Sequence, residues 1–351
     1  MSIDILLSSN SRSGYSQDVV DLFAKPSGAK HQFRYASKWI SAEVLNQISK
    51  GAYGQKREAV LCYVDQATKN TPPIVLPVRY ATFVEIREHG STVSIVFKLS
   101  DFCKLDDIKA FNSALRSAQP EVPDYKDEQI TGKYWLFDDG KAVEKIERSN
   151  ELSDWERLIA AYYQTPNSID AMPFYRFEGI VDLETGTTVK PKHNGGELLY
   201  TLEGGKKYEV RVYHFHPKDN FPEYALKVSS DDENLVPLNG DSRVLHTRYD
   251  RKDYRFKTKQ MILGATNYLS FRRTEKDSGK LIWEDFLLGI RINISWKLIV
   301  AYVVMIAIGF AAPFIVRTFI DPDKDSPVII AALVGGLIVG AATLLKEKIR
   351  L

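Results

Sequence analysis

The chain has 351 residues, of which 44% are hydrophobic and 26% are charged, so it is long enough for two or three domains with apolar cores. Its formal net charge of +2 is too small to indicate general binding to nucleic acid. Its two cysteines exclude a disulfide-rich scaffold and are expected to be buried thiols.

Residues 1–150 are predicted to form an α+β domain. The clearest pattern is a β-hairpin between Val78 and Leu99, in which apolar residues alternate on both sides of a turn at Gly90. Serine caps or apolar residues at helical spacing predict three helices: Ser16–Ala24, Ser41–Ile48 and Asp106–Ala118.

Residues 151–168 are predicted to be a connector helix, because Ser153–Glu156 reads as a capping box before an apolar run that ends ahead of Pro166. Residues 169–290 predict an all-β, sandwich-like domain, since short alternating segments are separated by Gly, Pro, Asn and Asp turns. The expected strands are Phe174–Val181, Glu197–Leu202, Tyr208–His216, Tyr224–Val228, Arg243–Thr247, Tyr254–Lys257 and Tyr268–Arg272.

The C-terminal residues 297–351 contain two apolar runs without charged residues, Leu298–Val316 and Pro327–Leu345. Each run is about 19 residues, or roughly 28 Å as a helix, which matches the hydrocarbon core of a bilayer. The pattern predicts a transmembrane helical hairpin, and the apolar stretch Leu281–Ile290 is expected to lead directly into it. The alternative is a helical hairpin buried in a soluble core.

The expected location is a membrane that the chain crosses twice, as a multi-pass protein with its soluble part and both termini in the cytoplasm. Residues Met1–Gly14 lack a basic segment followed by an apolar one, so no signal peptide is predicted. Lys and Arg number six in residues 280–297 and 346–350 together, against two in the loop 317–326, and these residues favour the cytoplasmic side.

Motifs for catalysis and metal binding are few. The chain has no phosphate-binding P-loop, Rossmann glycine pattern, HExxH, GxSxG elbow or protein-kinase set, so the sequence predicts no enzyme and no cofactor. His214 and His216 share one face of an expected strand, but no third ligand stands at a local spacing, so no metal site is predicted.

A basic stretch from Arg243 to Lys259 carries seven Lys or Arg against two Asp, with His, Tyr and Phe rings between them. Cationic groups with interleaved rings suit a phosphate backbone with stacked bases. The alternatives are a solvated strand pair, or a patch that faces anionic lipid headgroups. The predicted ligand site on this stretch comprises Arg248, Tyr249, Arg251, Tyr254 and Arg255.

A second, shorter basic-aromatic cluster runs from Lys30 to Tyr35 and continues at Lys38 and Trp39. It has the same combination of cations and rings over fewer residues. This cluster, or a cleft between the domains, is the other expected place for an anionic ligand.

Small residues recur every four positions in the second apolar run, at Ala332, Gly336 and Gly340. Such a face lets helix backbones approach closely, so it predicts helix packing in a homo-oligomer. Packing against the first run within one chain is the alternative.

The organisation of a soluble part to about Ile290 followed by two apolar spans resembles the two-helix membrane effectors of bacterial antiphage defence systems. The resemblance implies a cytoplasmic sensor that binds an anionic nucleotide or oligonucleotide and gates an oligomeric transmembrane pore, or ion channel, that disrupts the inner membrane. The alternative is a membrane-anchored adaptor whose β domain binds a protein partner. A membrane-tethered hydrolase is a third interpretation.

Overall fold

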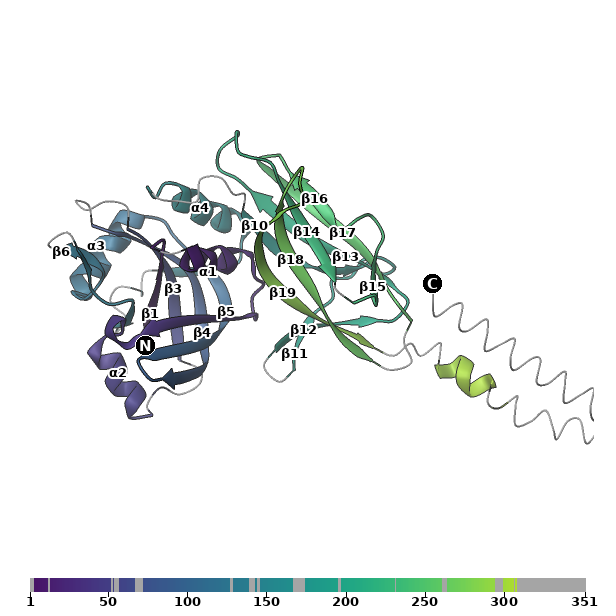
Figure 1. Cartoon of the computed structure of the whole chain (residues 1–351), viewed down its shortest axis with the longest axis horizontal. Helices are drawn as coiled ribbons and strands as arrows, with labels where there is room; N and C mark the ends of the chain where they lie inside the picture. Colours follow the sequence, from purple (N-terminus) through teal and green to yellow (C-terminus); the bar gives the residue numbers. More distant parts are fainter. Residues whose placement is uncertain are drawn as a thin grey trace, which may run out of the picture.

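The computed structural model describes residues 3–11, 13–51, 53, 57–66, 72–126, 129–138, 143, 146–166, 174–194, 197–230, 232–260, 264–293, 299–305 and 307. Strands predominate among these residues. They form a mixed sheet flanked by helices and a β-sandwich, and these two parts lie side by side (Figure 1).

The N-terminal part is built on one mixed sheet. Its strands are β1 (Ile3–Ser9), β2 (Lys30–Ala36), β3 (Glu58–Asp65), β4 (Ile74–His89), β5 (Thr92–Lys104), β8 (Trp135–Asp138) and β9 (Glu147–Ser149). Their order is β2-β5-β4-β3-β1-β8, and β9 pairs with β5. β1 and β3 pair in parallel, whereas the other pairs described in this sheet are antiparallel.

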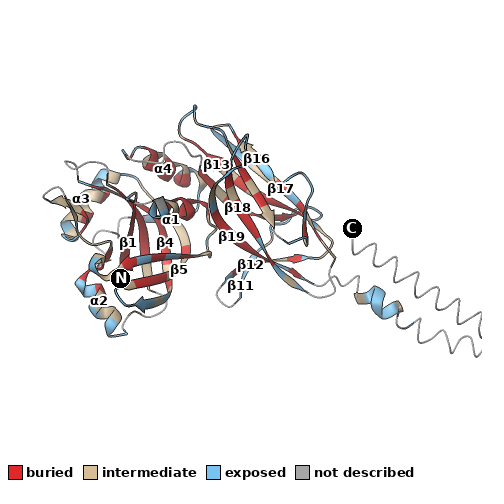
Figure 2. Cartoon of the chain, viewed as in Figure 1, coloured by how far each residue is buried: buried red, intermediate tan, exposed pale blue. Residues whose placement is uncertain are grey.

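Helices cover both faces of this sheet. They are α1 (Ser13–Ala24), α2 (Ala42–Ser49), α3 (Ile108–Ala118) and α4 (Leu152–Tyr163), with a 3₁₀ turn η1 (Ser37–Trp39) and a small hairpin of β6 (Asp124–Lys126) and β7 (Gln129–Thr131). α1 and α4 share a core with Leu6 and Leu61, while α3 packs on the other face with Ile5 and Leu7. Successive β1 residues therefore point into different cores, and the strand is buried on both sides (Figure 2).

The C-terminal part is a sandwich of two sheets around one apolar core. The four-stranded sheet has the order β10 (Phe174–Asp182), β13 (Lys207–Phe215), β17 (Tyr249–Thr258) and β15 (Leu235–Pro237). The six-stranded sheet has the order β11 (Pro191–Asn194), β12 (Glu197–Glu203), β19 (Leu281–Asn293), β18 (Ala265–Glu275), β14 (Tyr224–Ser230) and β16 (Ser242–Leu245).

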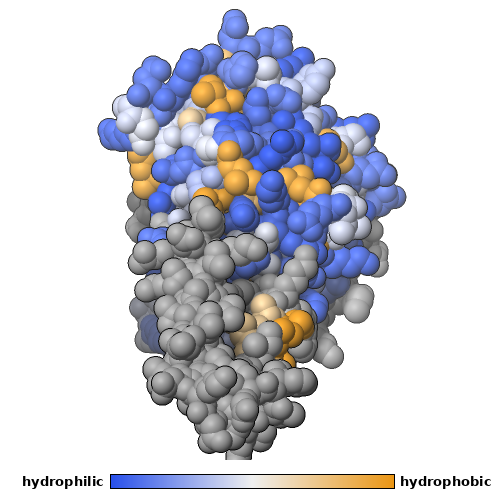
Figure 3. Space-filling view, turned by 90° about the vertical axis from the view of Figure 1, so that its right-hand side faces the viewer, coloured by the Kyte–Doolittle hydropathy of each residue, from blue (hydrophilic) through white to orange (hydrophobic). Residues whose placement is uncertain are grey.

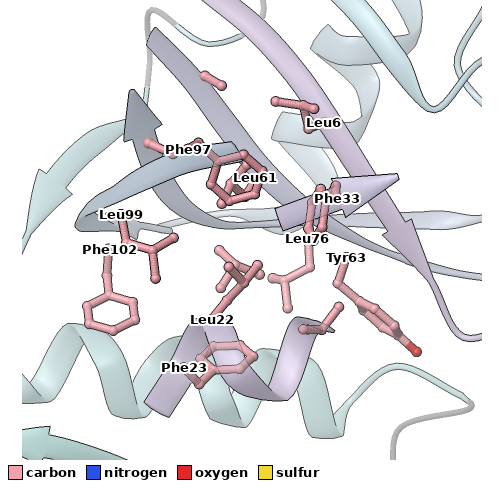
Figure 4. Packing of buried hydrophobic residues seen from close by; sticks show 14 of the residues in the cluster. Leu6, Leu22, Phe23, Phe33, Leu61, Tyr63, Leu76, Phe97, Leu99 and Phe102 are labelled. Atoms are coloured by element: carbon pink, nitrogen blue, oxygen red, sulfur yellow. The ribbon is translucent and has the colours of Figure 1, made fainter. Parts of the chain in front are cut away.

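α1 joins the two parts through a shared core. Leu22 and Phe23 lie among side chains of the mixed sheet (Figure 4). The Phe23 ring also contacts Phe174 of β10 with ring centroids 5.1 Å apart, and Ala24 belongs to the sandwich core. A helix packed on both sides in this way fixes the two parts against each other.

Arg79 of β4 holds the C-terminal end of α1 in place through hydrogen bonds. Its buried guanidinium donates hydrogen bonds to the carbonyls of Leu22 at 2.8 Å, Lys25 at 2.6 Å and Ser100 at 2.7 Å. The last carbonyls of a helix lack partners within the helix, so this arginine satisfies them. Burial lowers the pKa of Arg79 to about 9.

The transmembrane hairpin expected for residues 297–351 is corrected by the structure. No helix among the described residues is long and apolar enough to span a bilayer, so a multi-pass membrane protein or an ion channel is not supported. The longest helices named above have 12 residues, whereas a span needs about 20. Beyond 299–305 and 307, the two apolar runs lie outside the described residues, as do Ala332, Gly336 and Gly340.

Two local expectations are also corrected. The stretch Leu281–Ile290, expected to lead into the membrane, is part of β19, which pairs with β18 and β12 inside the sandwich. α4 begins at Leu152 and has Glu151 as its N-cap residue, without a side-chain cap, so Ser153 is not the cap of a capping box. The helix starts earlier because the Ser149 hydroxyl already accepts the Glu151 amide and turns the chain there.

Candidate ligand pocket

A pocket of about 310 Å³ lies at the carboxyl end of β1, which pairs in parallel with β3, and is also lined by the end of β2. This edge of a sheet is where α/β proteins commonly bind ligands, because the loops that leave the strands converge there. The pocket is lined by Leu7, Ser8, Ser9, Ser11, Tyr15, Asp18, Phe33, Arg34, Tyr35, Ala36, Lys38, Trp39 and Tyr134.

The loop between β1 and α1 is fixed by its own polar side chains. The Asn10 amide donates to the Asp65 carboxylate at 3.0 Å and its oxygen accepts the Gln66 amide at 3.1 Å, which ties the loop to the end of β3. The hydroxyls of Ser9 and Ser11 lie 2.8 Å apart at the pocket wall. The loop therefore presents hydroxyl groups in a set arrangement.

Aromatic rings form the opposite wall. The rings of Trp39 and Tyr134 meet edge to face with centroids 5.5 Å apart, and the Tyr35 hydroxyl donates to the Leu7 carbonyl at 3.0 Å. Burial raises the pKa of Tyr134 to about 12, so its phenol remains a proton donor at neutral pH. Aromatic rings that are fixed in place next to polar groups are typical of pockets that bind a planar ligand.

Two cations stand at this pocket without carboxylate partners. Arg34 and Lys38 are both exposed, and neither forms an ion pair within the described part of the chain. The Lys38 ammonium lies 5.0 Å from the centroid of the Trp39 ring. The positive charges of Arg34 and Lys38 are therefore available to bind an anion at the pocket.

Asp18 is the one carboxylate among the residues that line the pocket. Burial raises the pKa of Asp18 to about 6, although the nearby Lys25 ammonium acts to lower it. The His31 ring lies close by, with its Nε2 3.9 Å from the Asp18 carboxylate. Burial keeps the pKa of His31 well below its usual value, and its Nδ1 accepts from the Lys25 ammonium at 2.8 Å, so the ring is neutral. A carboxylate with such a pKa in a pocket marks a functional-site candidate.

The predicted site on β17 is placed elsewhere, on the sandwich. Arg251 binds Glu178 through two hydrogen bonds of 2.6 and 3.1 Å, and Arg255 binds Glu209 at 2.9 Å. The surface seen from the sandwich end is largely hydrophilic, with apolar residues in separate spots (Figure 3). Both arginines of β17 are therefore paired with carboxylates, one of β10 and one of β13.

The two tyrosines of that predicted site differ in position. Tyr254 is 3% exposed, and its hydroxyl donates to the Leu226 carbonyl inside the sandwich core. Tyr249 is 63% exposed. Arg248 lies before β17, with its guanidinium 3.7 Å from the exposed Asp219. Four of the five predicted residues lie on β17 and Arg248 directly precedes it, but the buried Tyr254 does not share a surface with the arginines.

No protein-family model matches this chain, and no curated protein matches it either. The pocket therefore has to be interpreted from its own chemistry.

Metal binding has little support among the residues that the structure describes, where no three His, Cys, Asp or Glu side chains gather in a possible metal site. His214 is fully buried and its Nε2 lies 2.8 Å from the Thr247 carbonyl. His216 stacks on Phe221 with ring centroids 4.2 Å apart. Both rings serve the packing of the sandwich edge.

Sequence reasoning found part of this pocket and missed the rest. Of the second expected ligand region, Phe33, Arg34, Tyr35, Lys38 and Trp39 line the pocket, whereas Lys30, His31 and Gln32 do not. The serine-rich loop after β1 and the distant Tyr134 were not singled out. A run of serines directly after a fully buried strand was the pattern that could have identified the loop, since loops at strand ends carry binding groups.

Proposed function

We propose that this chain is a nucleotide-binding sensor whose α/β part holds a small, anionic, aromatic ligand in the pocket described above. The observation that carries the proposal is that Arg34 and Lys38, which form no ion pair among the described residues, line a pocket with aromatic walls. Free cations beside rings fit a phosphate that is joined to a planar base.

The binding mode follows from where each group stands. A base would lie against Trp39 and Tyr134, since stacking on an aromatic ring is worth roughly 1–3 kcal/mol per base. The phosphate would lie on the side of Arg34 and Lys38, where it meets charge and guanidinium donors. The hydroxyls of the β1–α1 loop would complete the polar contacts.

The size of the pocket limits the ligand. A volume of about 310 Å³ is at the lower end of the range for small-molecule sites. One mononucleotide fits this range better than a longer strand. Binding without turnover is proposed, because no serine hydroxyl of the pocket contacts an imidazole base among the described residues.

A second candidate function is that of an adaptor that binds a protein partner through the sandwich. The observation in its favour is a pair of exposed apolar side chains on the six-stranded sheet, Tyr268 at 46% and Leu287 at 57% exposure. They are close to each other because Tyr268 pairs with Gly289 and Leu287 with Ser270. Exposed apolar groups of this kind are common at interfaces.

The test is calorimetric titration of the full chain with AMP, GMP, CMP and UMP across a salt series. Replacing both cations, Arg34→Gln with Lys38→Gln, is expected to lower the affinity about 10- to 100-fold and to reduce its salt dependence, because phosphate contacts are lost. The matched control, Arg251→Gln with Arg255→Gln, removes two arginines that already have carboxylate partners and is expected to leave the affinity unchanged.

Two outcomes would contradict the proposal. Absence of binding by all four nucleotides would leave the adaptor as the better interpretation. Loss of binding in the β17 variant alone would move the ligand to the stretch Arg243–Lys259, as the sequence first indicated.

A further inference from the structure

Asp18 differs from the buried carboxylates Asp4 and Asp21 because its partly exposed oxygens have no hydrogen-bond donor among the described residues. Asp4 accepts from Tyr53 at 2.6 Å and pairs with Arg57 at 2.5 Å, and Asp21 pairs with Lys25 at 2.9 Å. Asp18 accepts no hydrogen bond from any residue that the structure describes.

The basic residues next to Asp18 are engaged elsewhere or form no ion pair with it. The Lys25 ammonium is bound to Asp21 and to the His31 ring, and His31 is neutral and 3.9 Å away. Arg34 and Lys38 share the pocket lining with Asp18 but form no ion pair with it. A carboxylate that is 31% exposed in a pocket and accepts no hydrogen bond from a described residue has its oxygens available for donors of a bound molecule.

We infer that Asp18 determines ligand specificity by accepting two adjacent donors from the bound molecule, as the N1–H and exocyclic amine of guanine provide. This inference rests on the proposed nucleotide site. An ionised carboxylate has acceptors only, so it repels phosphate and requires the donor edge of the ligand. The cations Arg34 and Lys38 then take the phosphate, and Asp18 takes the base.

The other bases present a poorer match to two carboxylate oxygens. Adenine and cytosine place a ring acceptor beside their amine, and uracil places carbonyls on both sides of its N–H. Each of these bases would place an acceptor lone pair opposite a carboxylate oxygen of Asp18, and the two acceptors would repel each other. The vicinal hydroxyls of ribose are a second source of paired donors, so the test separates ribose from base.

The experiment compares the affinity of the full chain for GMP, IMP, AMP and 2′-deoxy-GMP. Wild type is expected to bind GMP about 10- to 100-fold more tightly than IMP, which lacks the exocyclic amine, and to bind 2′-deoxy-GMP as well as GMP. Asp18→Asn keeps the size of the side chain and is expected to remove this preference for GMP while AMP binding changes little. Asp219→Asn, an exposed carboxylate of the sandwich, serves as control.

The failures of the two proposals are distinguishable. If nucleotides bind equally and Asp18→Asn leaves their ranking unchanged, the role of Asp18 is wrong and the pocket proposal stands. If 2′-deoxy-GMP alone loses affinity, Asp18 reads the ribose and the assignment to guanine is wrong. If no nucleotide binds, the proposed function itself is wrong.

Discussion

Two regions of the molecule share a basic and aromatic character but differ in their surroundings: Lys30–Trp39 on β2 and η1, and Arg243–Lys259 on β16 and β17. Both combine cations with aromatic rings. On β17 the arginines are bound by carboxylates, and Tyr254 is inside the sandwich core. On β2 and η1 the cations are free of ion pairs among the described residues, and the rings line a pocket. Density of charge along a sequence therefore does not show which charges remain free to bind a ligand.

The position of each strand in its sheet explains the difference. β17 lies between β13 and β15, so its side chains have neighbours on two sides, and Arg255 stands directly opposite Glu209. β2 is an edge strand with β5 as its one neighbour, where Arg34 stands opposite Ser94. Opposite charges across strands attract one another, whereas a serine leaves the arginine free.

The largest expected effect tests the tyrosines of β17. Tyr254→Ala should lower the free energy of unfolding by about 3–5 kcal/mol, because it empties a buried aromatic site in the sandwich. Tyr249→Ala, the exposed partner variant, should change it by less than about 0.5 kcal/mol. Urea unfolding of both variants checks this, and equal effects would mean that Tyr254 is not a core residue.

A smaller effect is expected from the carboxylates that hold the β17 arginines. Glu209 is 4% exposed and bonds to both Arg211 and Arg255 at 2.9 Å, so Glu209→Gln should cost about 1–3 kcal/mol of stability. Glu233→Gln removes an exposed partner of Lys259 and should cost less than about 0.5 kcal/mol.

Combining Glu209→Gln with a second substitution tests whether ion pairing explains the difference between β17 and β2. When Glu178→Gln is added to Glu209→Gln, the two main arginines of β17 lose their partners. The double variant should then bind single-stranded oligonucleotides weakly and with strong salt dependence, unlike wild type. Filter-binding at two salt concentrations would detect it, and no gain of binding would show that ion pairing is not what distinguishes β17 from β2.

The smallest expected effect concerns Asp18 and depends on pH. Burial raises its pKa in the folded chain to about 6 from 3.8, so the folded chain holds the proton more tightly than the unfolded chain. Wild type therefore loses stability as the pH rises from about 4 to 6 and loses no more above that range. Asp18→Asn does not titrate, so it should be more stable than wild type above pH 6 and equal to it below pH 4.

The size of that difference follows from the two pKa values. The shift of the Asp18 pKa from 3.8 to about 6 corresponds to at most about 3 kcal/mol of stability. We expect about 1–2 kcal/mol because the side chain is partly exposed. Thermal unfolding of both proteins between pH 4 and 8 gives the comparison, and a constant difference across this range would contradict it. Asp4 and Asp21 are present in both proteins, so their titration cancels.

Features that depend on residues close together in the chain could be predicted from the sequence. The β4–β5 hairpin turns at Gly90 with φ of 59°, Ser41 caps α2 by accepting the Val44 amide, and α3 follows its apolar spacing. Each is confirmed because hydrogen bonding and burial are decided within a few residues. The short strands of residues 174–293 were visible for the same reason, although β19 was taken for an approach to a membrane because apolar content alone does not distinguish the two.

The tertiary structure decided what depends on distant segments. The pocket joins the loop after Ser9, the first turns of α1, the strand that carries Arg34 and, from about one hundred residues further along, Tyr134. The pairing of Glu178 and Glu209 with β17 likewise depends on strand order and register. No local sequence pattern predicts these contacts. Whether a cation is free or paired with a carboxylate depends on which strand lies beside it in the fold.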